Sequence, residues 1–359
     1  MWAILLAIPA VALVLMVLGY YAWAKTTYPA YACGSFAKPD GEIGWVLREN
    51  ASSCIGGRDV SGETEGFHAE VFTDVNGFRS ARAGVETQTG GVFFVGDSWT
   101  FGFGVEYEDS FPGRFEALTD APVAVAASPA YSALQAILLG ERWVERIEPK
   151  ALVYLDHGFW ERAACRGSSR PTRILKPCFW QPAPDAPAET VAPPPGRVET
   201  AWRWGNLPGG VLGVGETGWD YFLISRPLAQ IQQLLVRIGL ASGFGHDFAA
   251  WGVDRDEMRR ATLARLGGLA EKGGVPLLLL DPGEYYGDML GELPEAQRAL
   301  IHRVGAQPWS EEVSAPANLL PPDQARVPGD GHYGPGSNDL IARLIAAELT
   351  RIGALPSAP

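Results

Sequence analysis

The chain has 359 residues, of which 47% are hydrophobic, so it is long enough to bury a full-sized core, and its composition excludes disorder of the whole chain. Its 41 acidic and 29 basic residues give a formal net charge of −12, which leaves no long basic track for a phosphate backbone. We therefore expect no nucleic-acid partner. Length alone allows one large domain with insertions or two smaller ones.

The chain begins with an apolar segment. Residues 1–24 carry no charged side chain, and the run from Trp2 to Tyr21 is almost wholly apolar, which matches the ~20 residues that a helix needs to cross a bilayer. This run is longer than the apolar core of most signal peptides, which favours an uncleaved anchor, whereas Ala22-Trp23-Ala24 also fits a small-x-small cleavage site. The sequence predicts a membrane anchor or a signal segment here.

Residues 25–88 are rich in Gly, Ser, Thr and Asp and show little helical periodicity, which predicts a loop-rich lead-in over the core. From residue 89 onward, short apolar strands alternate with helical stretches. The strands are expected at 92–95, 123–126, 151–155 and 275–281, with a possible fifth at Leu319-Leu320, and the helices at 110–118, 132–147, 254–272 and 336–352. This alternation predicts an α/β fold with a three-layer, doubly wound, flavodoxin-like parallel sheet of about five strands.

Between residues 165 and 253 the alternation breaks down. This stretch contains Pro-rich pieces at 182–184 and 193–195 and a helical pattern near 228–240. We interpret it as a Pro-rich insertion over the active edge of one domain that spans residues 89–352 and is followed by a short tail at 353–359.

Four cysteines fall into two pairs with short separations, Cys33 with Cys54 and Cys165 with Cys178. This spacing is consistent with two local disulfides in an oxidising compartment, although four cysteines allow three pairings and four reduced, packed thiols are the alternative. A zinc site is not expected, because the spacings are not C-x₂-C and no histidine lies close to either pair. The sequence calls for no metal and no other cofactor.

A candidate nucleophile follows the first expected strand of the domain. The stretch Gly96-Asp97-Ser98 places a hydroxyl at the carboxyl end of strand 92–95, the edge where parallel α/β sheets usually carry their chemistry. A serine hydroxyl needs a base within hydrogen-bond reach and donors for the oxyanion that forms on attack. If Ser98 opens a helix, its own backbone N–H points into the site with the positive end of the helix dipole behind it. A plain helix N-cap is the alternative role for Ser98.

A candidate base lies near the other end of the chain, at Asp330-Gly331-His332. His332 is the natural proton acceptor for Ser98, and Asp330 can hold the imidazole ring in the required tautomer. Both are also turn residues in a Pro- and Gly-rich cluster that precedes the last helix, which is the alternative reading of this segment.

These motifs resemble the SGNH/GDSL hydrolase family. The resemblance is carried by Asn76-Gly77-Phe78-Arg79, by Val92 to Val105 with its Gly-Asp-Ser block, and by Asp330-Gly331-His332-Tyr333 followed by Gly336 and a terminal helix. This order is seen in bacterial members with an N-terminal membrane segment, and the resemblance covers about half the chain. It differs from the G-x-S-x-G elbow of α/β-hydrolases, in which the Asp and the His are far apart in sequence.

The resemblance implies a Ser98 nucleophile, a His332 base and an Asp330 orienting group that act on carboxylic esters. Many members place the aspartate three residues before the histidine, where this chain has Gly329. The chain instead resembles the D-x-H variant of other members, including alginate-acetyltransferase-like proteins.

The family usually completes its oxyanion hole with a backbone N–H from a glycine after the second strand and an asparagine side chain after the third. Here Ala130 takes the glycine position, and the segment around Gly158 contains no asparagine. Losing one such donor typically costs about 10²–10³-fold in rate. We expect Ser98 and Ala130 to donate their N–H groups, with His157 or a backbone amide replacing the asparagine.

The sequence thus predicts an extracytoplasmic serine ester hydrolase or O-acyltransferase that acts on O-acyl groups of a glycan or other small ester. Its expected location is a bacterial cell envelope, anchored in the inner membrane with the domain in the periplasm or extracytoplasmic space, or secreted if the anchor is cleaved. The alternative is a non-catalytic envelope protein that keeps the fold and binds a glycan or a protein partner in the cleft. The missing asparagine favours that alternative.

Overall fold

A computed structural model describes residues 36–57, 66–158, 163–165, 176–183, 186–193 and 254–356, together with positions 11, 14–16, 18 and 19. In this part of the chain, no helix is both long and apolar enough to cross a membrane. The membrane segment expected at 1–24 lies largely outside the described residues. The helix expected near 228–240 and most of the expected insertion also lie outside them.

The core is a five-stranded sheet in which every neighbouring pair of strands is parallel. Its strands are β6 (Val92–Gly96), β7 (Val123–Ala127), β8 (Ala151–Leu155), β11 (Leu277–Leu280) and β12 (Ile301–Val304). They lie in the order β12-β11-β8-β6-β7, and every residue of β6, β7, β8 and β11 is buried. The expected α/β fold with a parallel sheet of five strands is confirmed. The chain direction across the sheet reverses between β6 and β8, the kind of position at which open α/β sheets bind ligands.

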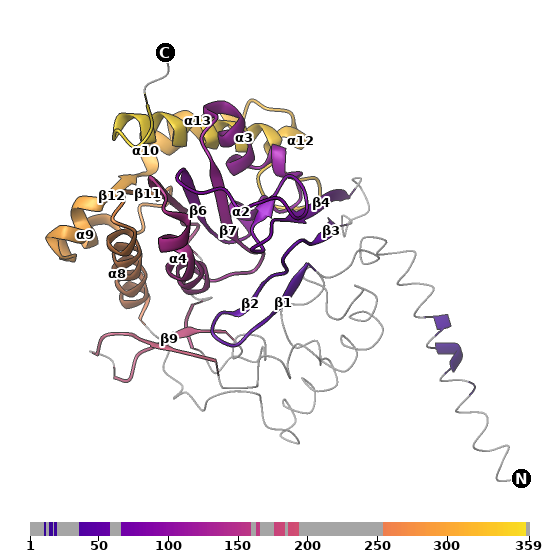
Figure 1. Cartoon of the computed structure of the whole chain (residues 1–359), viewed down its shortest axis with the longest axis horizontal. Coiled ribbons are helices and arrows are strands. Elements are labelled where there is room, and N and C mark those ends of the chain that lie inside the picture. Colours follow the sequence, from indigo (N-terminus) through magenta and orange to yellow (C-terminus); the bar gives the residue numbers. More distant parts are fainter. Residues whose placement is uncertain are drawn as a thin grey trace, which may run out of the picture.

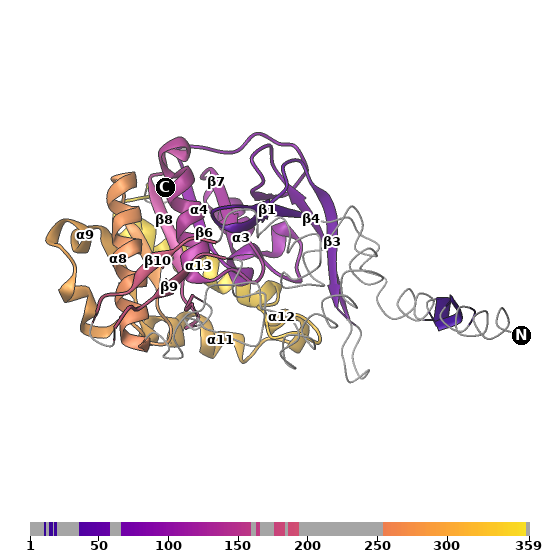
Figure 2. The same ribbon diagram turned by 90° about the horizontal axis from the view of Figure 1, so that it is seen from below.

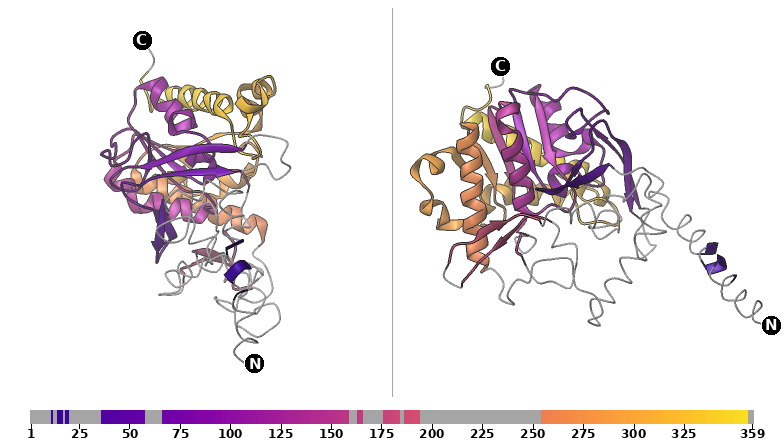
Figure 3. Two further views of the ribbon diagram at one scale, coloured as in Figure 1. Left: turned by 90° about the vertical axis from the view of Figure 1, so that its right-hand side faces the viewer. Right: turned by 60° about the horizontal axis from the view of Figure 1, so that its bottom comes forward.

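Helices cover both faces of this sheet and complete the three layers. The long helices are α3 (Phe111–Thr119), α4 (Ala133–Ile147), α8 (Arg255–Gly273) and α13 (Pro335–Arg351). Helices α4 and α8 pack together on one face, and α3 and α13 pack together on the other (Figures 1 and 3). Helix α4 begins with a capping box between Ser132 and Gln135, which fixes the point where the chain leaves the β7 loop.

Short helical segments fill the connections between these elements. They are α2 (Ser98–Phe101), η2 (Tyr107–Asp109), η6 (Gly287–Glu292), α9 (Glu295–Leu300), α10 (Ala306–Trp309), η7 (Ser310–Ser314), α11 (Ala315–Ala317) and α12 (Pro322–Ala325). The first of them carries Ser98, and the last three precede the segment with Asp330 and His332.

The position expected for the fifth strand was wrong. The edge strand is β12 (Ile301–Val304), which pairs with β11, whereas Leu319 is 87% exposed between α11 and α12. Ile301 and Val304 are buried and the two residues between them are only partly buried, so β12 is not a continuous apolar run. The prolines that follow Leu320 instead begin a helix, because proline is tolerated in the first turn of a helix.

The lead-in contains more regular structure than expected. Strands β1 (Ala37–Asp40) and β2 (Gly44–Leu47) form one antiparallel pair, and β3 (Ser52–Gly57), β4 (Phe67–Thr73) and β5 (Arg79–Ser80) form a three-stranded antiparallel sheet. Both lie beside the β7 edge of the central sheet (Figures 1 and 2). Polar residues and glycine interrupt the apolar pattern of β1, β3 and β5, so the sequence gives little sign of these strands.

Strand β2 supports the loop that follows β7. Trp45 is fully buried, and its indole Nε1 donates a hydrogen bond to Ser128 Oγ at 3.2 Å. The Tyr131 hydroxyl donates in return to the carbonyl oxygen of Trp45 at 2.6 Å. These bonds fix both ends of the segment that carries Ala130.

A second hairpin lies against α8 (Figure 2). It consists of β9 (Cys178–Trp180) and β10 (Glu189–Val191), and the Ala188 N–H donates to Glu257 of α8 at 2.8 Å. A disulfide joins Cys165 to Cys178, as the sequence spacing predicts. The other expected pair includes Cys33, which lies outside the described residues.

Candidate active site

Ser98 lies at the first turn after β6. Asp97 is the N-cap of α2, and its carboxylate accepts a hydrogen bond from the Trp99 N–H at 3.0 Å. A Cβ atom at Gly96 would lie 2.0 Å from Thr100 Oγ1, so only glycine allows the first turn of α2 to pack this closely on the end of β6. The chain therefore turns sharply at the carboxyl edge of the sheet and places Ser98 there.

His332 and Asp330 lie in the loop between α12 and α13. The Val327 N–H donates to the His332 carbonyl, and the Asp330 N–H donates to the Val327 carbonyl, both at 3.0 Å, which closes the loop on itself. Within it, Asp330 Oδ1 accepts the backbone N–H of His332 at 2.9 Å and also contacts Nδ1 of the ring. The D-x-H spacing thus lets one carboxylate oxygen hold both the backbone and the side chain of the histidine.

The structure brings these two distant segments together. Nε2 of His332 lies 2.8 Å from Oγ of Ser98, and Nδ1 of the same ring faces Asp330. The result is a hydrogen-bonded chain from hydroxyl to imidazole to carboxylate. Such a chain can remove a proton from Ser98 as the hydroxyl attacks a carbonyl carbon.

Close packing between loops supports this arrangement. Gly104, which follows α2, has a φ of 86°, and a Cβ atom there would lie 2.6 Å from a methyl carbon of Val327. A larger residue would therefore separate the Ser98 segment from the His332 loop. The absence of a side chain at Gly104 thus allows the segment with Ser98 to pack directly on the loop with His332.

The electrostatics of Asp330 suit an orienting carboxylate. Partial burial raises the pKa of Asp330, but hydrogen bonds from the His332 side chain and backbone outweigh burial, so the pKa lies below its usual value of 3.8. Asp330 is therefore ionised at neutral pH and accepts a hydrogen bond from the N–H at Nδ1 of His332. This leaves the lone pair of Nε2 directed at Ser98.

Aromatic rings surround the histidine. The Trp99 ring lies 4.6 Å from the His332 ring and 4.2 Å from the His157 ring, measured between centroids. Phe103 and Tyr333 complete the cluster, at 4.8 Å from His332 and 4.5 Å from Trp99. These aromatic residues lie within the motifs that carry the resemblance, but sequence reasoning assigned them no role, although their positions directly beside or shortly after Ser98 and His332 were a usable signal.

Two backbone donors are available at this edge of the sheet. Ala130 has a φ of 64°, a left-handed conformation that is uncommon for a residue with a side chain. Across the described ranges, the N–H groups of Ser98 and Ala130 donate to no protein acceptor. Both groups follow the carboxyl ends of strands that are neighbours in the sheet, β6 and β7.

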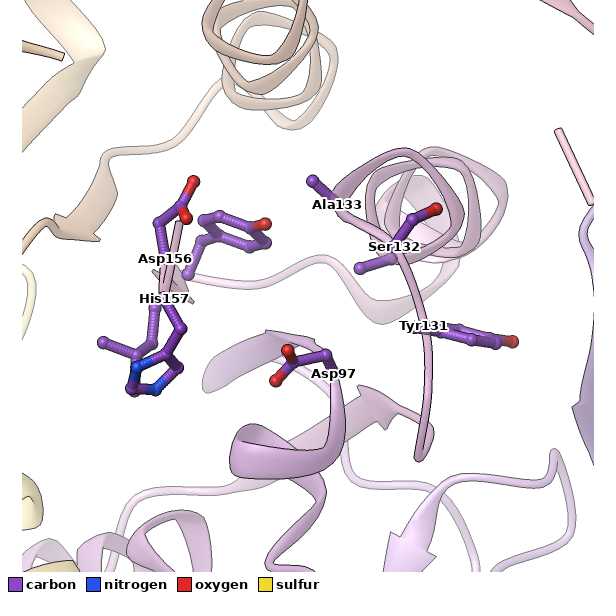
Figure 4. Close-up of a pocket in the computed structure, with 9 residues that line it drawn as sticks. Asp97, Tyr131, Ser132, Ala133, Asp156 and His157 are labelled. Carbon is purple, nitrogen blue, oxygen red and sulfur yellow. The ribbon is translucent and has the colours of Figure 1, made fainter. Parts of the chain in front are cut away.

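His157 follows β8 and lines a small cavity at the ends of β6, β7 and β8, together with Asp97, Tyr131, Ser132 and Asp156. Figure 4 shows the Asp97 carboxylate pointing across this cavity toward the His157 ring. The neighbouring Asp156 accepts hydrogen bonds from the Gly158 N–H at 2.6 Å and from the Tyr286 hydroxyl. The third strand therefore contributes an imidazole ring and an engaged carboxylate where the resemblance implies an asparagine.

No family model and no curated protein sequence matches this chain. Among solved structures, the chain is similar to the crystal structure of a carbohydrate esterase family 2 enzyme with a carbohydrate binding domain, from Corynascus thermopiles (Myceliophthora fergusii). The two chains are 10% identical with a TM-score of 0.38, and the match covers 89% of this chain and 92% of that one. A TM-score of this size does not establish a shared fold.

Proposed function

We propose that this chain is a serine esterase, or an O-acyltransferase with the same chemistry, that acts on O-acyl groups of a glycan or other small ester. The observation that carries the proposal is the 2.8 Å contact between Ser98 Oγ and His332 Nε2, with Asp330 on the other ring nitrogen. A nucleophile, its base and an orienting carboxylate in one hydrogen-bonded chain are the parts that acyl transfer requires.

In the acylation step, His332 Nε2 takes the Ser98 proton as Oγ forms a bond to the ester carbonyl carbon. Asp330 stabilises the imidazolium that results, and it holds the ring in place. When the tetrahedral intermediate collapses, the ester C–O bond breaks and the imidazolium gives its proton to the departing alkoxide. The products of this step are a free alcohol and an acyl group on Ser98.

The negative charge that develops on the carbonyl oxygen needs preorganised donors. We assign the N–H groups of Ser98 and Ala130 to this role, because neither has a protein acceptor in the described part of the chain. We include His157 as a third donor, because its ring lines the cavity at the end of β8 and lies against Trp99.

In the deacylation step, His332 removes a proton from an incoming hydroxyl, whose oxygen attacks the acyl carbon. The bond between the acyl carbon and Ser98 Oγ then breaks, and the imidazolium returns the proton to Oγ. Water as the incoming group gives hydrolysis, and a sugar hydroxyl gives O-acyl transfer. The same residues serve both outcomes, so the acceptor is decided by what binds beside His332.

We further propose an extracytoplasmic location in a bacterial cell envelope, with residues 1–24 as an inner-membrane anchor, or secretion if that segment is cleaved. The Cys165–Cys178 disulfide supports an oxidising compartment. The apolar, uncharged composition of residues 1–24 supports a membrane segment.

The test is turnover of an aryl acetate by the purified full-length chain and by Ser98→Ala. We expect turnover by the wild type and a loss of about 10⁴-fold or more in the variant. Ser110→Ala is the matched control, because Ser110 is also a buried serine at the start of a helix, the N-cap of α3. The control should lose stability but not activity.

The rival function is binding of a glycan or a protein partner without catalysis. The absence of an asparagine near Gly158 favours it. No turnover by the wild type, together with glycan binding that Ser98→Ala leaves unchanged, would support this rival and refute the enzyme.

A further inference from the structure

Arg326 lies on the loop that carries the candidate base. It follows α12, and its backbone forms an isolated antiparallel bridge with Tyr333. Its guanidinium donates one hydrogen bond, from an Nη1 atom to the Gly331 carbonyl at 3.0 Å. The guanidinium carbon lies 4.8 Å from the centre of the Tyr333 ring and 5.8 Å from that of Trp99. Arg326 is thus held beside the residues that flank Ser98 and His332.

This guanidinium has unused binding capacity. It is exposed and forms no ion pair with any carboxylate of the described ranges, in a chain whose net charge is −12. Arg142, Arg265 and Arg303, by contrast, each form an ion pair. Nε and Nη2 of Arg326 donate to no acceptor in this part of the structure. A guanidinium with two free donor nitrogens, Nε and Nη2, is suited to binding a carboxylate, sulfate or phosphate group.

Two cavities meet at Arg326, and they differ in charge. The first, of about 540 Å³, is lined also by Asp323 and Asp330, whose carboxylates disfavour an anion. The second, of about 450 Å³, has no carboxylate in its lining and contains the aromatic residues Trp309 and Tyr333. Ser314 and Asn318 add hydroxyl and amide groups to its wall.

The second cavity combines the features that bind a charged sugar. Partly exposed Tyr333 gives a sugar an apolar surface to pack on, whereas Trp309 is only 6% exposed and packs against Tyr333. Hydroxyl and amide groups in the wall can bond the hydroxyls of the sugar. Tyr333 contacts both Trp99, next to Ser98, and Trp309, in the cavity, so the cavity adjoins the reacting centre.

We propose that Arg326 binds an oxyanion carried by the substrate, and that the cavity lined by Trp309 and Tyr333 receives the sugar ring that bears it. This inference rests on the proposed function, and it defines the substrate class as an acidic glycan. Arg326 is then a specificity-determining residue, which selects substrates by charge and takes no part in proton transfer.

The test measures binding in the full-length Ser98→Ala chain, so that turnover does not interfere. The probes are a neutral hexose trisaccharide and its counterpart in which uronic acids replace the hexoses, titrated by calorimetry. Trisaccharides with a single sulfate or phosphate form further arms, which distinguish the source of the oxyanion. The same titrations are made with Arg326→Gln and Arg326→Lys added. Arg298→Gln is the matched control, because Arg298 is exposed on α9, has no described ion pair and precedes the amino end of β12.

We expect at least one of the charged probes to bind about 10- to 100-fold more tightly than the neutral one, as for hydrogen bonds to a charged group. Arg326→Gln should remove most of this preference, Arg326→Lys should retain part of it, and Arg298→Gln should leave it unchanged. Equal binding of all probes, no binding of any, or a preference that survives Arg326→Gln would overturn the inference. These outcomes are independent of aryl acetate turnover, on which the proposed function depends.

Discussion

The hydroxyl oxygen of Ser98 lies 2.8 Å from Nε2 of His332, although 234 positions separate the two residues in the chain. The parallel sheet brings Ser98 to its carboxyl edge, and the loop between α12 and α13 carries the histidine to the same edge. The two segments pack closely where Gly104 meets Val327, because glycine has no side chain to keep them apart. The proposed chemistry depends on this contact between elements near opposite ends of the domain.

Asp330→Asn should lower kcat by about 10²–10⁴-fold with a smaller effect on KM. An amide carries no charge to stabilise the imidazolium, and its NH₂ group can turn toward Nδ1 and select the wrong tautomer. Steady-state kinetics with an aryl acetate measure this effect. Asp323→Asn, an exposed aspartate of α12, is the control, and an equal loss in both variants would argue against an orienting role for Asp330.

His157→Phe should lower kcat by about 10²–10³-fold and leave KM nearly unchanged, because an oxyanion donor acts mainly in the transition state. Phenylalanine keeps a ring against Trp99, so packing is largely retained. The measurement is the separate determination of kcat and KM. If kcat falls less than about threefold, His157 only packs against Trp99.

Ala130→Gly should stabilise the protein by about 0.5–1 kcal/mol or leave its stability unchanged, and it should preserve activity. The φ of 64° is strained for alanine and free for glycine, while the backbone N–H proposed as an oxyanion donor remains. Chemical denaturation measures the effect on stability, and aryl acetate turnover measures the effect on activity. A large loss of activity would show that the methyl group, rather than the N–H, matters at this position.

Asp40→Asn should destabilise the protein in a pH-dependent way. Burial raises the pKa of Asp40, but hydrogen bonds from Arg142 and from backbone N–H groups outweigh it, so the pKa in the folded state is lowered from 3.8. A lowered carboxyl pKa contributes stability above its unfolded value, and this contribution is lost as the pH falls through the folded value.

We therefore expect the free energy of unfolding of the wild type to exceed that of Asp40→Asn by about 1–2 kcal/mol near neutral pH. The reason is that Arg142 binds both carboxylate oxygens of Asp40, at 2.8 and 3.0 Å. The difference should shrink as the pH falls below 3.8. Urea denaturation at several pH values measures it, and a difference independent of pH would exclude the ion pair as its source.

The parts of the fold that the sequence predicts are those with one strong local signal. Strands β6, β7, β8 and β11 are short, fully buried apolar runs between helical stretches, and they lie where the pattern indicates. Strand β12 was missed because it lies at an edge, where partly buried His302 and Arg303 interrupt the apolar pattern. The two leucines expected in its place have no sheet neighbour that would bury them.

The candidate site also has one part that the sequence predicts and one part that it does not. Ser98, Asp330 and His332 stand in short motifs that together resemble those of a known hydrolase family, so their meeting was expected from the sequence. The surroundings of Arg326 were not, because its free donors and the two cavities beside it exist only after the α12–α13 loop has folded against Trp99. The sequence alone does not show which arginines form ion pairs, because the arginines are scattered among many acidic residues.

The most direct test of the central claim is covalent labelling of the full-length chain with a fluorophosphonate, followed by peptide mass spectrometry. The Ser98 oxygen should displace fluoride and carry the label, the label should be absent from Ser98→Ala, and labelling should slow by about 10²-fold or more in His332→Ala. Labelling of Ser98 at the same rate in His332→Ala, or no labelling of Ser98 in the folded wild type, would contradict the account.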